Sequence, residues 1–130
     1  MRFNMIEIRR VEDPCLQERL CKEAGIELRP EYHIIATREG EKILLSAIFQ
    51  YKDEAGAILS IEGPDNDIML LDGLCRAILN IMDINGVKEV SLPLKYGLLA
   101  RNIGFTKGET AFSLQLEGFF DQPCCGKKGE

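Results

Sequence analysis

Short runs of alternating apolar and polar residues lie near both ends of the chain. In residues 5–10 isoleucines alternate with charged residues, and residues 111–117 repeat the pattern with phenylalanine and leucine. A period of two is typical of a strand with one buried face. We therefore expect half-buried strands at both places, with Phe119 and Phe120 as an extension of the second.

Three further apolar segments follow one another in the first half of the chain. They span residues 33–37, 43–51 and 57–61, and the short turns between them each contain a glycine. Such turns join antiparallel neighbours, so the segments predict a three-stranded meander. Before it, Asp13 and Pro14 predict the start of a helix, since aspartate favours the N-cap and proline the first turn.

The longest apolar stretch has helical spacing. Apolar residues recur every three or four positions from about Asp67 to Asn85, and Gly86 provides a typical helix end. An apolar strand follows at residues 87–92, and a short helix at residues 98–102. Because a helix that crosses over between two strands of one sheet makes them parallel, the strands before and after the long helix should be parallel.

Together these elements predict an α/β (α+β) protein with a mixed, mostly antiparallel sheet of six or seven strands. The long helix is the crossover between the fourth and fifth strands. We expect one domain over residues 1–121, and a mobile tail over the small, charged and glycine-bearing residues 122–130.

Charge and composition narrow the expected partners. The 130 residues carry a net charge of -5, and no apolar run reaches the length of a membrane span or resembles a signal peptide. We expect a cytoplasmic protein that binds neither membranes nor nucleic acid. A homodimer and a small-molecule or protein acceptor are left open as partners. The sole histidine, His33, opens an apolar strand, for which a surface or edge position is the simpler explanation.

The number and spacing of the cysteines indicate no disulfide framework. An odd number at irregular spacing argues against disulfides, and we expect Cys75 to be a buried hydrophobe of the long helix. The adjacent Cys124 and Cys125 are a poor pair for zinc, and no metal site is expected. A thiol or metal-handling role for them is the weakest functional hypothesis, and two exposed thiols on the tail are the simpler reading.

Three segments resemble the GNAT superfamily, the Gcn5-related N-acetyltransferases. They are ILSIEGP at residues 58–64, LCRAILNIMDINGVKEVSL at residues 74–92 and LLARNIGFTKGE at residues 98–109. They look like that family's fourth strand, its long helix with the fifth strand, and its short helix ending in a Gly-Phe pair. The order of the elements also agrees with the family over nearly the whole chain.

The resemblance implies acetyl-CoA as the cofactor, bound where the fourth and fifth strands separate, and an amine as the acceptor. By family position, the backbone of seven residues contacts acetyl-CoA: Ser60, Ile61, Asp67, Ile68, Met69, Leu70 and Leu71. Glu62 ends the fourth strand, where relatives often hold a base. Tyr96 is the candidate acid, because the family's usual tyrosine position is occupied here by Ala100.

The turn entering the long helix departs from the family pattern. Residues 66–71 read NDIMLL and lack the family's glycines and arginine, and residues 53–75 contain six acids but no Lys or Arg. Asp65 and Asp67 are candidate N-caps, and their charge disfavours a diphosphate at the helix start. Two hypotheses therefore stand. One is an acyl-CoA-dependent N-acetyltransferase with a strongly divergent cofactor site. The other is a non-catalytic domain of the same fold that binds a protein partner or a small ligand between strands four and five.

Overall fold

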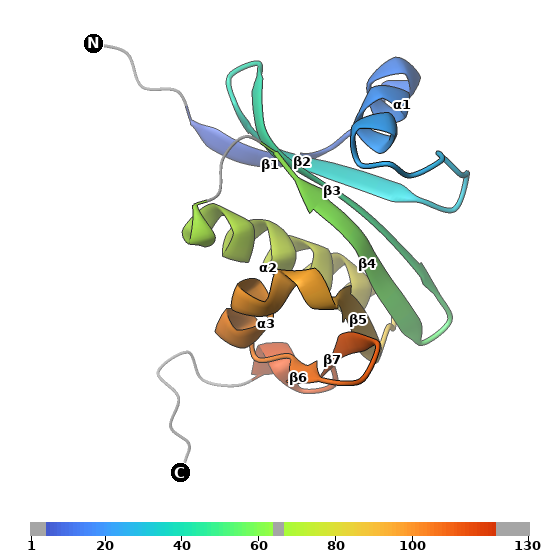
Figure 1. The fold of residues 1–130 in the computed structure, drawn as a ribbon, viewed down its shortest axis with the longest axis vertical. Coiled ribbons are helices and arrows are strands. Elements are labelled where there is room, and N and C mark those ends of the chain that lie inside the picture. The colour runs from blue at the N-terminus through green and yellow to red at the C-terminus, as the bar shows by residue number, and fades with distance from the viewer. Residues whose placement is uncertain (1–4, 64–66, 122–130) are drawn as a thin grey trace.

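A computed structural model describes residues 5–63 and 67–121 of the chain. The described strands form one sheet in the order β1-β2-β3-β4-β5-β7-β6 (Figure 1). The strands are β1 (Ile6–Arg10), β2 (His33–Glu39), β3 (Lys42–Lys52), β4 (Ala55–Glu62), β5 (Glu89–Pro93), β6 (Thr106–Lys107) and β7 (Ala111–Gln115). The helices are α1 (Pro14–Glu23), α2 (Ile68–Ile84) and α3 (Gly97–Ile103), with 3-10 turns η1 (Leu94–Tyr96) and η2 (Phe119–Asp121).

The predicted fold class is confirmed. Strands β4 and β5 are parallel, and the other described pairings are antiparallel, which gives the mixed sheet with α2 as the crossover helix. None of the described helices is both long enough and apolar enough to cross a membrane.

Two local predictions were wrong, and one short strand was not predicted. Phe119 and Phe120 belong to η2 rather than to the last strand, because Gly118 turns the chain at a φ of 80° and the Phe119 N–H bonds back to the Leu116 carbonyl. The two-residue strand β6 was not predicted, since so short a segment shows no period. Strand β1 is an exposed edge rather than half-buried, with Ile6 50% and Ile8 41% exposed.

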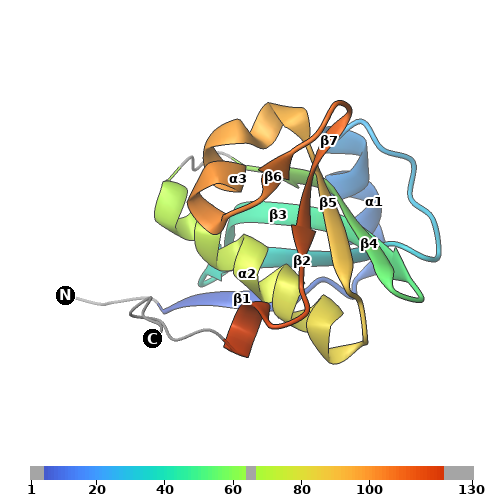
Figure 2. The same cartoon turned by 90° about the horizontal axis from the view of Figure 1, so that it is seen from below.

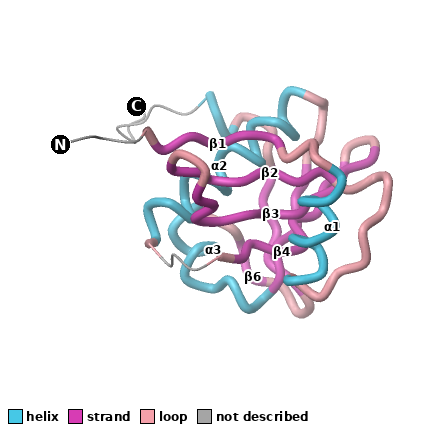
Figure 3. The backbone as a smooth tube through the Cα atoms, turned by 90° about the horizontal axis from the view of Figure 1, so that it is seen from above, coloured by secondary structure: helices cyan, strands magenta, loops and turns pink. Residues whose placement is uncertain are grey.

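The helices lie on opposite faces of the sheet. Helix α1 covers one face near β1, β2 and β3, whereas α2 and α3 lie against the other face (Figures 2 and 3). The larger core fills the space between the sheet and α2, where Leu74, Cys75, Ile78, Leu79 and Met82 are fully buried. The predicted apolar stripe of the long helix and the burial of Cys75 are both confirmed.

Both longer helices start on an aspartate, as predicted. The Asp13 carboxylate accepts the Cys15 N–H, and the Asp67 carboxylate accepts the Met69 N–H at 2.8 Å. Each cap satisfies a donor that the first turn of a helix leaves without a partner inside the helix. The other predicted cap, Asp65, lies outside the described residues.

Candidate functional site

Strands β4 and β5 pair over a short length and then separate. The parallel register joins residues Ala55–Ala57 to residues Glu89–Ser91 and goes no further, although β4 continues to Glu62 and β5 to Pro93. A register shift between Ile48 and Phe49 of β3 marks a bulge in this part of the β3–β4 ladder. Such bulges bend the strand that carries the extra residue and increase its twist. We call the gap between residues 58–62 of β4 and the end of β5 the β4/β5 slot.

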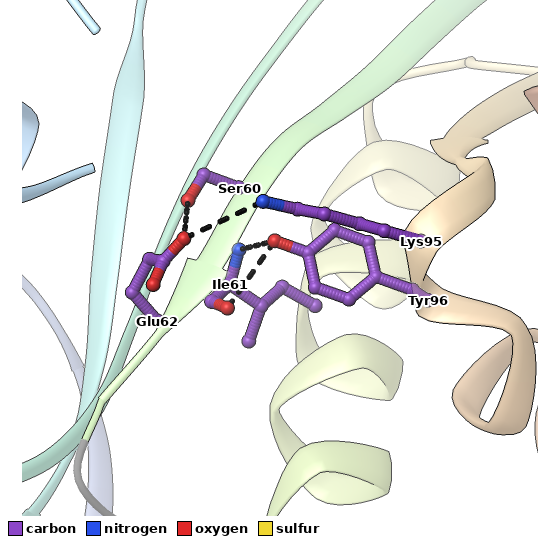
Figure 4. A network of polar contacts seen from close by, with 5 residues as sticks. All are labelled: Ser60, Ile61, Glu62, Lys95 and Tyr96. Carbon is purple, nitrogen blue, oxygen red and sulfur yellow. Dashed lines mark hydrogen bonds and ion pairs between the residues drawn. The ribbon is translucent and has the colours of Figure 1, made fainter. Parts of the chain in front are cut away.

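The hydroxyl of Tyr96 occupies the edge of β4 inside this slot. It accepts the Ile61 N–H at 2.8 Å and donates to the Ile61 carbonyl at 3.3 Å (Figure 4). In a strand, the N–H and C=O of one residue point to the same edge. The side chain of Ile61 is buried, so this backbone pair needs a partner, and Tyr96 supplies it.

Glu62 lies next to this contact. Its carboxylate accepts the Ser60 hydroxyl at 3.4 Å, and the Lys95 ammonium lies 3.7 Å from the same oxygen (Figure 4). The structure therefore brings the two predicted catalytic residues, Glu62 and Tyr96, to the same part of β4. Lys95 was not singled out from the sequence. The signal for it was the absence of any cation in residues 53–75, which left the acids there to find partners elsewhere in the chain.

Acids of that segment have cationic partners elsewhere in the described part of the chain. Glu54 pairs with Lys88 at 3.6 Å, Glu62 with Lys95, and Asp72 with Arg76 at 2.6 Å. Exposed pairs of this kind contribute about 0–1 kcal/mol to stability. The cations of these pairs nevertheless offset part of the negative charge, so this region repels an anion less strongly than the sequence indicated.

At the start of α2, backbone N–H groups already have partners within the chain. The Met69 N–H donates to the Asp67 carboxylate, and the Leu71 N–H donates to the Asp67 carbonyl. The side chains of Ile68, Leu70 and Leu71 pack against the core, whereas Met69 is 78% exposed. The carboxylate of Asp67 thus already provides a negative charge at the positive end of the helix dipole.

Two hollows lie on the face of the sheet opposite α2. The larger, about 750 Å³, lies where β4 and β5 still pair, and Glu31, Gln50, Ala57 and Ser91 are among its lining residues. Gln50, Ala57 and Ser91 stand side by side in register across three strands. The smaller, about 210 Å³, lies beside Glu62 and extends to Arg19 of α1.

The two hollows lie at opposite ends of the diverging part of β4. Glu62 lies five positions after Ala57, and a strand rises about 3.3 Å per residue, so roughly 15 Å lies between them. Glu62 therefore does not act on a group held in the larger hollow without a large movement.

Of the cysteines in the described part of the chain, Cys15 is exposed, whereas Cys21 and Cys75 are buried. Burial, with a smaller effect of Asp72, raises the pKa of Cys75 to about 12, and Arg76 opposes this. Across residues 5–63 and 67–121, no three potential metal-ligating side chains cluster. Cys124 and Cys125 lie outside the described residues.

Comparison with known proteins identifies the fold. No protein-family model and no curated protein matches the chain. Solved structures do match it. An N-acetyltransferase from Staphylococcus aureus has a TM-score of 0.65 at 16% identity, over 87% of this chain and 99% of that one. The ribosomal-protein-S18-alanine N-acetyltransferase from Escherichia coli has a TM-score of 0.64 at 15% identity, over 84% and 90%. A Bacillus subtilis acetyltransferase in complex with CoA has a TM-score of 0.64 at 8% identity, over 85% and 99%.

Proposed function

We propose that this chain, which has the GNAT fold, is an N-acyltransferase that moves an acyl group from a CoA thioester to an amine. The observation that carries the proposal is the β4/β5 slot, where two parallel strands separate and the backbone pair of Ile61 faces the gap. An extended ligand with an amide can pair with such an edge as an added strand does. Acetyltransferase structures with this fold, one of them holding CoA, support the proposal.

Two observations test the fit of acyl-CoA to these residues. The edge of β4 at Ser60 and Ile61 fits an amide-bearing arm, because Ile61 offers one donor and one acceptor to the slot. The start of α2 fits a diphosphate poorly, because the Asp67 carboxylate occupies the Met69 N–H and repels a second anion. We therefore assign the arm to β4 and derive no step through the diphosphate.

Glu62 and Tyr96 are the groups we propose for proton transfer. A bound thioester supplies the acyl group. Glu62 would take the proton of the attacking amine as the C–N bond forms, and Tyr96, once the arm has displaced it from Ile61, would give its proton to the sulfur as the C–S bond breaks. The hollow of about 210 Å³ beside Glu62 gives the amine a route from the α1 face. The Lys95 ammonium, 3.7 Å from the carboxylate, helps to orient Glu62.

An acetyl-CoA titration is the first experiment. A ligand that binds only the folded chain raises its stability by about 2.7 kcal/mol at a concentration of 100 Kd. We expect a rise in Tm that follows the acetyl-CoA concentration, together with binding heat in calorimetry. No shift at saturating acetyl-CoA would overturn the proposal.

The catalytic role of Glu62 needs a separate experiment. Loss of a general base lowers kcat by about 10²- to 10⁴-fold, so we expect that loss for Glu62→Gln with a panel of amine acceptors. Glu31→Gln, in the larger hollow, is the matched control and should keep its kcat. The reverse result would move the reaction centre to the larger hollow.

A second candidate function is a non-catalytic domain of the same fold that binds a partner or a small ligand in the slot. It is favoured by the two internal contacts, Tyr96 on Ile61 and Asp67 on Met69, which occupy the places where acyl-CoA would bind. This candidate predicts no acetyl-CoA binding. It predicts instead a copurified ligand or a stable complex, which native mass spectrometry of the purified chain would detect.

A further inference from the structure

We propose that Tyr96 is the gate of the β4/β5 slot and restricts it to ligands that carry an amide. In the closed state its hydroxyl holds the backbone pair of Ile61, and an entering ligand must replace it there. The inference rests on the proposed function for the identity of the ligand.

The hydrogen bonding of Tyr96 is the basis of this inference. A phenolic hydroxyl both donates and accepts, so one group can satisfy the N–H and the C=O of Ile61 together, at 2.8 and 3.3 Å. A secondary amide also carries one donor and one acceptor. The hydroxyl of Tyr96 thus takes the place of a ligand amide along β4 (Figure 4).

The surroundings of Tyr96 allow this contact to open. Tyr96 ends the 3-10 turn η1, and its ring is half-buried at the margin of the core, whereas Ile61 is 5% exposed. On the solvent side the ring is covered by Lys95, whose ammonium lies 5.3 Å from the ring centre and pairs with Glu62. Because an exposed ion pair is weak and the ring lies at the margin of the core, we expect the ring to swing outward while the fully buried residues keep their places.

The same contact explains why the gate would select for amides. If an apolar chain displaced Tyr96, it would leave the buried N–H and C=O of Ile61 without partners, which is costly. A ligand with an amide at this position restores both hydrogen bonds. Pantetheine, with two amides in an extended chain, meets this requirement, whereas an alkyl thiol of similar length does not.

Calorimetry with the unaltered chain, two variants and two probes tests the gate. The probes are pantetheine and a straight-chain alkyl thiol of similar length. Because closure reduces the fraction of chains competent to bind, we expect Tyr96→Phe to bind pantetheine roughly tenfold more tightly than the unaltered chain. Tyr32→Phe removes a hydroxyl outside the slot and should leave the Kd unchanged. The alkyl thiol should bind none of the three chains measurably.

Each other outcome decides against a specific claim. Equal pantetheine affinity in Tyr96→Phe and the unaltered chain overturns the gate but keeps the proposed function. No pantetheine or CoA binding by either chain overturns both. Tight binding of the alkyl thiol overturns the selection for amides.

A measurement on the unaltered chain tests the gate even if the Tyr96→Phe variant does not fold. With ¹³C-labelled tyrosine, the ring signals of Tyr96 should shift as pantetheine saturates, while those of Tyr32 stay in place. The Ile61 amide should remain protected from hydrogen exchange, because the ligand takes over its hydrogen bond. Tyr96 signals that stay at their ligand-free positions in the saturated complex would overturn the gate.

Discussion

Gly63 lies directly against the backbone of Leu44, where the end of β4 meets β3. A Cβ atom at Gly63 would be 2.3 Å from the Leu44 carbonyl oxygen, which is closer than real contacts allow. Because the obstructing atom belongs to the backbone, a side-chain rotation cannot relieve the clash. Any residue other than glycine at position 63 must therefore displace the end of β4, which lines the β4/β5 slot.

We expect Gly63→Ala to lower the free energy of unfolding by about 1–3 kcal/mol, as other overpacked sites do. Gly73→Ala is the matched control, since a Cβ there meets nothing within 4 Å and lies inside α2. Alanine in a helix interior should stabilise the chain by about 0.5–1 kcal/mol. Urea unfolding of both variants measures the difference. Equal effects would contradict the close approach of β3 and β4 at Gly63.

Two substitutions of Asp67 test the stability of α2 separately from its affinity for anions. Asn serves as an N-cap about as well as Asp, whereas Ala does not. We therefore expect Asp67→Asn to keep its Tm, and Asp67→Ala to lose about 1 kcal/mol or more of stability. Removing the charge should also strengthen CoA binding in Asp67→Asn by roughly fivefold, if about 1 kcal/mol of repulsion is relieved. Unchanged CoA affinity would show that the diphosphate does not bind at the start of α2.

The elements of this fold were largely predictable, whereas the contacts that control the site were not. The spacing of the apolar residues of α2 and the stop at Gly86 identify the crossover helix, and the crossover makes β4 and β5 parallel. Local chemistry also identified Asp67 as an N-cap. These features depend on residues a few positions apart, which a sequence shows directly.

The contact between Tyr96 and Ile61 joins residues 35 positions apart, and no spacing rule predicts it. Glu62 was singled out by family position, and Tyr96 as a substitute for the tyrosine that the family has at the position of Ala100. The hydrogen bonds that occupy Tyr96 depend on how far β4 and β5 separate. The ion pair of Lys95 with Glu62 has the same origin, because the packing of η1 against β4 brings the two side chains together. Long-range geometry thus decides whether the slot is open.

Thiol reactivity provides a test of the packing around α2. Cys15 is exposed, whereas burial raises the pKa of both Cys21 and Cys75, the latter to about 12. Only the thiolate attacks an alkylating agent, so at pH 8 iodoacetamide should modify Cys15 quickly and spare Cys21 and Cys75. Mass spectrometry of the digested chain gives the rate at each position. In denaturant these differences should vanish, and fast alkylation of Cys75 in the native chain would contradict its burial.

His33 gives a pH dependence whose sign follows from its surroundings. The residue starts β2 and pairs with Phe49 of β3, whereas the register that joins β2 to β1 begins only at Ile35, so the predicted surface or edge position agrees with the structure. Its ring stacks on Phe49 and Tyr51, and its Nδ1 lies 3.0 Å from a guanidinium nitrogen of Arg10. Burial, and then the charge of Arg10, lower the pKa of His33 below its usual 6.5. The folded chain therefore binds fewer protons than the unfolded chain in this range.

The free energy of unfolding should consequently fall as the pH drops below about 6.5, and level off below the folded-state pKa. His33→Gln removes this titration, so the difference between the unaltered chain and His33→Gln isolates it from the carboxylates. Urea unfolding of both between pH 5 and 8 measures that difference, and an NMR titration of the ring measures the pKa itself. A difference that grows in favour of the unaltered chain at low pH would mean a raised pKa, and would contradict the contact with Arg10.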